Sequence, residues 1–317
     1  MDYIITTNSL TKTYAKATKP ALSNINLSVK KGEVFGLLGP NGAGKSTLTL
    51  LLATLTEPSS GDALVGGHSI ISAPDKVRTC LGYCPQKTSL DEELTAWENM
   101  LLYVQLAGFR GQAAKEYVNQ LLKEAALTEK SLELVKNFSG GMSRRLEIMG
   151  AMIGQPQVIF LDEPTVGLDP VFRREIWQQI LKARDNGSTI FLSTHYMEEA
   201  EELCDRIAII DTGEIKVVEN PKNLKEMLGE AIHLRVFNDM NTVAVSEKIK
   251  TLDNDAVILN SPNELHIFTF KGEIMSSSLI QTLKSDNLAI KSISYSSATL
   301  DDVYLYYVGQ RIFEETV

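Results

Sequence analysis

The sequence has little of what marks secreted or membrane-spanning proteins. It contains three cysteines in 317 residues, without a second pair or a neighbouring histidine, so we expect reduced, packed thiols rather than disulfides or a metal site. Residues 1–7 carry neither the basic start nor the apolar core of a signal peptide. No apolar run approaches the roughly 18 residues that cross a bilayer. These absences predict a cytosolic chain without a membrane span.

Positive charge is also scarce. The chain has 31 Lys and Arg against 40 Asp and Glu, a formal net charge of −9, which argues against a nucleic-acid partner held by bulk charge. Hydrophobic residues make up 44% of the sequence. This length and composition suffice for about two domains with sizeable cores.

One stretch carries a phosphate-binding pattern. Residues 39–47 fit G-x-x-x-x-G-K-[ST], after the apolar run 34–38 and before the helix-like run 46–52. The glycines let backbone N–H groups close round phosphate oxygens, and the helix adds its positive N-terminus. Lys45 would reach the β- and γ-phosphates, and the Ser46 hydroxyl would ligate Mg²⁺. An ordinary glycine-rich loop is disfavoured, because strand, loop, Lys-Ser pair and helix are all in register. The pattern predicts a nucleoside triphosphate site formed by Gly39, Pro40, Asn41, Gly42, Ala43, Gly44, Lys45, Ser46 and Thr47.

Two adjacent carboxylates follow a second apolar run. Residues 158–161 are typical of a central parallel strand and lead directly into Asp162 and Glu163. Open α/β sheets bind ligands at the carboxyl ends of their strands. Two adjacent carboxylates at such a strand end cost free energy unless they have a partner, so they indicate a bound ligand or cation. We expect Asp162 to hold Mg²⁺ through water and Glu163 to polarise the attacking water. The alternative, in which both acids only cap the following turn, is disfavoured by the phosphate loop upstream.

Three further features are each weak evidence for a functional role alone, but they support one another. His195 is the first polar residue beyond the predicted strand 188–194; a lone histidine is more often structural, but this position favours a functional role. Residues 139–141, Ser-Gly-Gly before a helix-like run, form a second anion-binding helix start. Tyr14 lies in a polar break and by itself is a surface aromatic.

The order of elements predicts two domains. Residues 1–222 alternate strands and helices, which indicates an α/β domain with a largely parallel core sheet. Within it, residues from about 88 to 153 form a helical subdomain without the sustained heptads of a coiled coil. Residues 223–317 have the β-α-β-β-α-β order of a small ferredoxin-like α+β domain. This domain carries no phosphate loop, and a structural or dimer-stabilising role is favoured over ligand sensing.

In order and spacing these motifs resemble the nucleotide-binding subunit of ABC ATPases over residues 3–220. The resemblance implies a P-loop NTPase fold with an antiparallel β subdomain and a helical subdomain. It also implies a role for each motif. Residues 39–47 would be the Walker A loop, Gln86 the Q-loop glutamine at the metal and the reacting phosphate, and Ser139, Gly140 and Gly141 the signature. Asp162 and Glu163 would be the Walker B aspartate and the catalytic glutamate, Asp169 the D-loop aspartate, His195 the switch histidine, and Tyr14 the aromatic that stacks on adenine.

A narrower resemblance rests on two segments. Residues 146–148 after the signature, and residues 298–304 near the C-terminus, are similar to the daunorubicin-resistance-type exporter ATPases (ABC type 2 exporters). Phe138 and Met142 depart from the usual Leu and Gln of the signature but leave the Ser-Gly-Gly that meets phosphate.

The resemblance predicts an ATP-hydrolysing subunit that powers a membrane exporter through ATP-driven dimer closure. One P-loop and one separate anion-binding helix start imply that two chains complete each other's sites, in a homodimer or a heterodimer with a related ATPase. The expected partners are separate membrane-spanning permease subunits, contacted beside Gln86 and the helix at 94–110, at the cytoplasmic face of the membrane.

Two alternatives remain open. A soluble ABC-type mechano-ATPase acting on nucleic acid or ribosomes is disfavoured by the single nucleotide-binding unit, the missing coiled coil and the acidic charge. An ATP-binding regulator without turnover is disfavoured by Glu163 and His195.

Overall fold

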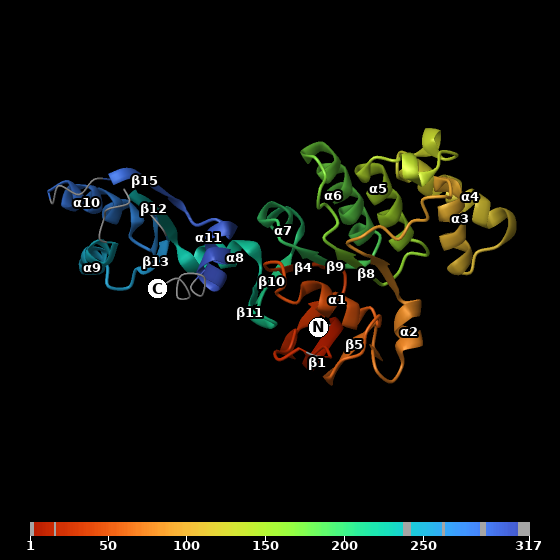
Figure 1. The fold of residues 1–317 in the computed structure, drawn as a ribbon, viewed down its shortest axis with the longest axis horizontal. Coiled ribbons are helices and arrows are strands. Elements are labelled where there is room, and N and C mark those ends of the chain that lie inside the picture. Colours follow the sequence, from red (N-terminus) through yellow and green to blue (C-terminus); the bar gives the residue numbers. More distant parts are fainter. Residues whose placement is uncertain (1–2, 16, 237–241, 262–263, 286–289, 310–317) are drawn as a thin grey trace. The chain divides into compact units, whose positions relative to one another are not determined.

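The structure, a computed structural model, describes five stretches of the chain: residues 3–15, 17–236, 242–261, 264–285 and 290–309. Contacts divide the chain into two compact units, Met1–Val218 and Glu219–Val317 (Figure 1). The predicted boundary between residues 222 and 223 falls slightly later, inside helix α8 (Pro221–Leu228). The domains 1–222 and 223–317 stay predictions close to this division.

A six-stranded sheet forms the centre of the first unit, with strand order β11-β10-β4-β9-β8-β7. The pairs from β10 to β7 are all parallel, as the alternation of strands and helices predicted. Every residue of β4, β8 and β9 is buried, because elements cover both faces of a parallel sheet. The strands are β4 Val34–Leu38, β7 Leu81–Cys84, β8 Val158–Asp162, β9 Thr189–Thr194, β10 Arg206–Asp211 and β11 Glu214–Glu219.

An antiparallel sheet and helix α1 cover one face of this central sheet (Figure 1). The sheet has the order β2-β1-β5-β6, and β3 also pairs with β1. Apolar side chains from this sheet, α1 and the central strands form one continuous core. The elements are β1 Tyr3–Lys12, β2 Leu22–Ile25, β3 Ser28–Lys30, α1 Lys45–Leu52, β5 Ser60–Val65, β6 His68–Ser69 and α2 Pro74–Thr79.

The predicted helical subdomain consists of α3, α4 and α5, which share a second core. Helix α3 starts at a capping box in which Thr95 and Glu98 satisfy each other's backbone N–H groups. Helices α6 and α7 pack on the central sheet on the side away from α1 (Figure 1). The bounds are α3 Ala96–Leu106, α4 Gly111–Glu124, α5 Gly140–Ala151, α6 Pro170–Asp185 and α7 Met197–Leu203, with short 3-10 turns at Thr128–Lys130 and Val135–Asn137.

The second unit has its own sheet, of order β13-β14-β12-β15, in which all pairs are antiparallel. Helices α9 and α10 bury apolar side chains against one face of it. The β-α-β-β-α-β order agrees with the sequence, and the strand order supports the ferredoxin-like assignment, which stays a prediction. The elements are α8 Pro221–Leu228, β12 Glu230–Val236, α9 Thr242–Leu252, β13 Val257–Ser261, β14 Glu264–Thr269, α10 Gly272–Ser285, β15 Ile290–Ser297 and α11 Leu300–Tyr304, the last continued by a π-helical turn Leu305–Gly309.

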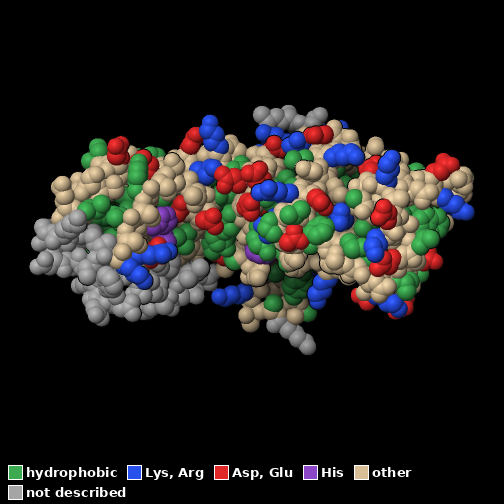
Figure 2. All heavy atoms as spheres, turned by 90° about the horizontal axis from the view of Figure 1, so that it is seen from above, with side chains coloured by type: hydrophobic (Ala, Val, Ile, Leu, Met, Phe, Trp, Pro, Cys, Tyr) green, Lys and Arg blue, Asp and Glu red, His purple; other side chains and the backbone are tan. Residues whose placement is uncertain are grey.

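The surface carries charges of both signs. On the face that Figure 2 shows, the described Lys and Arg side chains are interspersed with Asp and Glu, without a basic stripe. Among the described residues, no helix combines the length and the apolar character needed to pass through a bilayer. The three cysteines are free and buried.

Candidate functional site

The loop of residues 39–44 joins β4 to the first turn of α1. Gly44 is the N-cap of α1 and has φ 108°, a left-handed conformation that glycine adopts without strain. Gly39 has no room for a side chain, since a Cβ atom there would lie 2.4 Å from the carbonyl oxygen of Ile210. The backbone path therefore requires both glycines of the predicted motif.

Lys45 begins α1, and its ammonium group is buried in the loop. Nζ donates to the carbonyl oxygens of Gly39 at 2.8 Å and Pro40 at 3.2 Å, and lies 3.1 Å from Glu163 Oε1. Lys45 and Glu163 are each 5% exposed, so this ion pair is shielded from solvent. The fold thus brings together two residues that the sequence assigned to one site from separate motifs.

Glu163 follows β8 directly and is held through both its backbone and its side chain. Its N–H donates to the carbonyl oxygen of Ser193 at 3.0 Å, and its Oε2 lies 2.5 Å from His195 Nδ1. Its φ is 50°, a left-handed conformation that costs a non-glycine residue about 1 kcal/mol or more. Such strain persists only where the surroundings impose it, and it is concentrated at functional sites.

Asp162 is the last residue of β8 and pairs in register with Ser193 of β9. The Ser193 hydroxyl donates to Asp162 Oδ1, and Asp162 is 3% exposed. Parallel strands end at the same sheet edge, so Asp162, Glu163 and His195 meet there. Ser46, half-buried, follows Lys45 in the first turn of α1.

Arg144 is a residue of this site that the sequence analysis missed. From α5 its guanidinium donates to the carbonyl oxygens of Pro85, Asp162 and Pro164 and pairs with Glu147 at 3.0 Å. It therefore connects the segment before Gln86, the strand-end carboxylates and the helix that follows the Ser-Gly-Gly motif. A basic residue two positions after Met142 was the only local signal, and nothing nearby distinguished it from a surface arginine.

Gln86 lies just beyond the end of β7 and is exposed. The strand before it carries no charge at neutral pH. Burial, together with the nearby charge of Asp162, raises the pKa of Tyr83 to about 12, and burial raises the pKa of Cys84 to about 12.

Ser139 and Asp169 are exposed and act as helix caps within this chain. Ser139 Oγ accepts the Met142 N–H at the start of α5, and Asp169 Oδ1 accepts the N–H groups of Val171 and Phe172 at the start of α6. Gly140 is open to solvent, with nothing near the position of a Cβ atom. Ser139 and Gly140 therefore face outward, whereas Gly141 is buried beside Phe172.

Tyr14 lies beside the phosphate-binding loop. Its hydroxyl is 3.4 Å from Thr47 Oγ1 in α1, and Lys12 Nζ is 5.2 Å from the ring centroid. The side chain is 43% exposed, which leaves ring surface available for stacking.

The comparisons with known proteins agree with this geometry. The family model described as ABC transporter matches residues 22–166. The chain is 35% identical over 306 residues to the daunorubicin/doxorubicin resistance ATP-binding protein DrrA of Streptomyces peucetius, covering 96% of this chain and 92% of DrrA. It is 33% identical to the doxorubicin resistance ATP-binding protein DrrA of Mycobacterium tuberculosis, covering 96% and 93%.

The chain belongs to the ABC transporter ATP-binding protein family.

Solved structures of ABC cassettes support the same assignment. A dimeric ATP-binding cassette in a post-hydrolysis state, bound to ADP and Pi, superimposes with a TM-score of 0.63 at 28% identity, covering 68% of this chain and 98% of that cassette. The cbiO1 protein of Clostridium perfringens, part of the ABC transporter complex cbiONQ, gives 0.64 at 26% identity, covering 80% and 96%. The predicted P-loop fold of the ABC ATPase is confirmed.

This ABC ATPase is an ATP-hydrolysing, nucleotide-binding subunit that powers a membrane exporter, as the sequence predicted. A mechano-ATPase acting on nucleic acid or ribosomes is not favoured, because the relatives that match nearly the whole of this chain are drug-resistance ATP-binding proteins.

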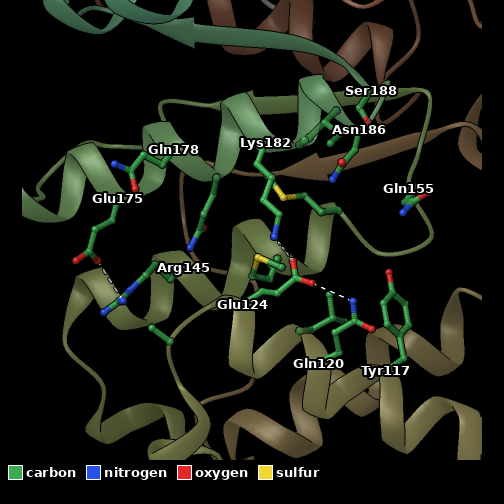
Figure 3. Close-up of a pocket in the computed structure, with 17 residues that line it drawn as sticks. Tyr117, Gln120, Glu124, Arg145, Gln155, Glu175, Gln178, Lys182, Asn186 and Ser188 are labelled. Carbon is green, nitrogen blue, oxygen red and sulfur yellow. Dashed lines mark hydrogen bonds and ion pairs between the residues drawn. The ribbon is translucent and has the colours of Figure 1, made fainter.

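A cavity of about 460 Å³ lies between α4, α5 and α6 of the ABC ATPase, and none of the predicted site residues lines it. Figure 3 shows Lys182 reaching Glu124, which also accepts from Gln120, and Arg145 reaching Glu175. These pairs connect α6 to α4 and α5. Because no residue of the phosphate-binding loop lines the cavity, the cavity is separate from that loop.

Proposed function

We propose that Lys45 and the loop at 39–47 hold the triphosphate of ATP and that Glu163 polarises the attacking water. The observation that carries this proposal is the buried contact of 3.1 Å between Lys45 Nζ and Glu163 Oε1. A phosphate oxygen that enters the loop replaces Glu163 and the two carbonyl oxygens as the partner of Nζ. Glu163 then loses its cation and becomes free to accept a proton from water.

His195 acts as the positioning residue for Glu163. The contact of 2.5 Å between its Nδ1 and Glu163 Oε2 supports this role. With a ring 34% exposed at the sheet edge, its other nitrogen is left to contact the γ-phosphate. Tyr14 would stack on adenine, since its exposed ring lies next to Thr47.

Ser46, Asp162 and Gln86 would hold Mg²⁺. The donor set fits this cation, because hydroxyl, carboxylate and amide oxygens are the hard ligands that Mg²⁺ prefers. When bound, Mg²⁺ supplies charge neutralisation between the β- and γ-phosphates. On the protein side, the Ser193 hydroxyl donates to Asp162, and Arg144 holds the backbone carbonyl oxygens of Asp162 and Pro164.

Two chains would form the complete site, as a homodimer or a heterodimer with a related ATPase. Ser139, Gly140 and Asp169 are exposed and make their contacts within α5 and α6, which suits residues that meet a ligand from the partner's side. Gly140 and Gly141 would bring backbone N–H groups to the γ-phosphate held by the other chain. ATP would close this dimer and hydrolysis would reopen it.

Separate permease subunits would dock beside Gln86, at the cytoplasmic face of the membrane. A groove of about 770 Å³ supports this, with Tyr83, Ser89, Tyr103, Leu106 and Ala107 among its lining. Leu106 at the end of α3 is 76% exposed, an apolar surface suited to a partner helix. We expect no nucleic acid among the partners.

The partner is tested by purifying the tagged protein from detergent-solubilised membranes. We expect a polytopic membrane protein at fixed stoichiometry, lost in Leu106→Asp but retained in Leu132→Asp, a matched control at another leucine that is 79% exposed. ATP binding should be equal in all three proteins. Co-purified ribosomal RNA or DNA in place of a membrane subunit would support the mechano-ATPase alternative.

A further inference from the structure

A cluster of two histidines and two carboxylates lies in the second unit. Ile232 and Leu234 of β12 pack in the core beneath α9 and α10, so His233 between them points to the opposite face of the sheet. His233 pairs directly with His266 of β14, and Glu264 lies two residues before His266 on the same face. The antiparallel register therefore collects all three side chains on one patch.

The ligand atoms of this patch are already close together. His233 Nδ1 lies 2.9 Å from His266 Nδ1, with the two rings edge to face. One ligand atom from each of His233, Glu264 and His266 lies within 4.8 Å of the others. Two imidazole nitrogens at this separation share either a proton or a cation, because their lone pairs otherwise repel each other.

A fourth residue, Asp302, contacts the ring nitrogen of His233 that does not face His266. Asp302 of α11 is 3% exposed, and its Oδ1 lies 3.2 Å from His233 Nε2. Asp302 is itself held by the Thr299 N–H at 2.8 Å and the Thr299 hydroxyl at 2.7 Å. A carboxylate on one imidazole nitrogen leaves the other nitrogen as the ligand, which is the usual outer arrangement round a metal-bound histidine.

We propose that His233, His266 and Glu264 bind a divalent transition cation of the zinc class, with Asp302 as the positioning residue. Two imidazole nitrogens and one carboxylate match the three-ligand set of zinc sites that keep a fourth position open. Mg²⁺ and Ca²⁺ are disfavoured because they select oxygen ligands.

The cation can reach this site from solvent. The side chains of His233 and Glu264 are 26% and 22% exposed. Arg235, which contacts Glu264 Oε1 at 3.2 Å and is 61% exposed, can keep that oxygen while the other one binds the cation. The bound cation would tie β12 to β14 and, through Asp302, to α11. None of these residues belongs to the nucleotide site, so this inference is independent of the proposed function.

Calorimetric titration of the full chain with Zn²⁺, without nucleotide, tests the site. A pH of about 8 limits competition from protons, since the Asp302 contact raises the pKa of His233. We expect one Zn²⁺ per chain. His233→Ala and His266→Ala should each weaken binding by more than the roughly 10–100-fold that loss of an outer hydrogen bond costs. His68→Ala, a matched control in β6 of the first unit, should bind like the parent.

Spectra and melting curves complete the test. Co²⁺ should give the parent an intense visible band typical of low coordination number, and Asp302→Asn should shift that band and weaken binding by about 10–100-fold. Zn²⁺ should raise the melting temperature of the parent but not of His266→Gln, a milder variant for use if His266→Ala fails to fold. Absence of one-site binding by the parent, or undiminished binding by the double variant His233→Ala/His266→Ala, overturns the proposal.

Discussion

Lys45 Nζ lies 3.1 Å from Glu163 Oε1, in a buried ion pair that joins the start of α1 to the end of β8. Each group satisfies the other's charge in this structure, and breaking such a pair by removing one partner typically costs about 3–5 kcal/mol. A triphosphate must therefore compete with Glu163 for Lys45. This competition links phosphate binding to the release of the proposed base.

Replacing Glu163 with Gln removes the carboxylate and keeps the shape of the side chain. ATP binding should survive, because the competitor for Lys45 is weakened, while steady-state hydrolysis should nearly stop. Gel filtration with ATP should show an accumulated dimer. Hydrolysis at the parental rate would assign the base to another residue.

Lys45→Ala should abolish nucleotide binding and not only turnover. The variant loses the phosphate contact and also leaves Glu163 buried without its cation, which adds negative charge where phosphate must enter. Equilibrium binding of a fluorescent ATP analogue measures the effect. Lys182→Ala, which removes a lysine that is 62% exposed, is the control and should bind normally; parental affinity in Lys45→Ala would contradict the assignment.

Tyr14→Ala should weaken ATP binding by roughly 1–3 kcal/mol, the scale of stacking between a base and an aromatic ring. Tyr14→Phe should change little, because stacking uses the ring and the hydroxyl contact to Thr47 is long at 3.4 Å. Binding titrations of the three proteins decide between the roles. Equal affinities would make Tyr14 a surface residue.

Ser139→Arg tests whether two chains share one site. The arginine should block closure by steric clash and misplaced charge, so hydrolysis should fall while the monomer still binds ATP through Lys45 and Ser46. Mixing this variant with Lys45→Ala joins two intact halves in a heterodimer, and partly restored hydrolysis would support the shared site. Parental hydrolysis by Ser139→Arg alone would exclude the signature from the active site.

Arg144→Met should lower the free energy of unfolding by about 3–5 kcal/mol, because it leaves Glu147 as an uncompensated buried charge and removes donors from three carbonyl oxygens. Urea denaturation measures the loss. Arg78→Met, at an exposed ion pair with Asp75, should cost less than about 1 kcal/mol. If the two variants lose the same small amount, Arg144 does not hold the site together.

Local patterns predicted the parts of the site that depend on neighbouring residues. The glycines at 39 and 44 are needed by the turn between β4 and α1, and Lys45 and Ser46 follow at fixed positions in that helix. Asp162 and Glu163 were predicted at a strand end for the same reason, since an apolar run that stops at carboxylates indicates where a buried strand reaches the sheet edge.

Contacts between distant segments could not be predicted in this way. Arg144 joins the segments at Pro85, Asp162 and Pro164 because α5 packs beside β7 and β8, and the sequence near Arg144 contains no trace of those partners. The pairing of His233 with His266 depends on the register of β12 against β14. A slip of one residue would place the two rings on opposite faces of the sheet.

The sequence by itself determined the phosphate-binding loop, the strand-end acids, the family, the alternation of strands and helices in the first unit and the β-α-β-β-α-β order in the second, because each depends on residues close together along the chain. The tertiary structure alone decided that Lys45 is paired with Glu163, that Glu163 is held by His195, and that His233, His266 and Asp302 meet. These contacts arise from strand order, register and helix packing. The burial of apolar side chains elsewhere in the fold sets that packing, and the polar residues of the two sites are brought together as a result.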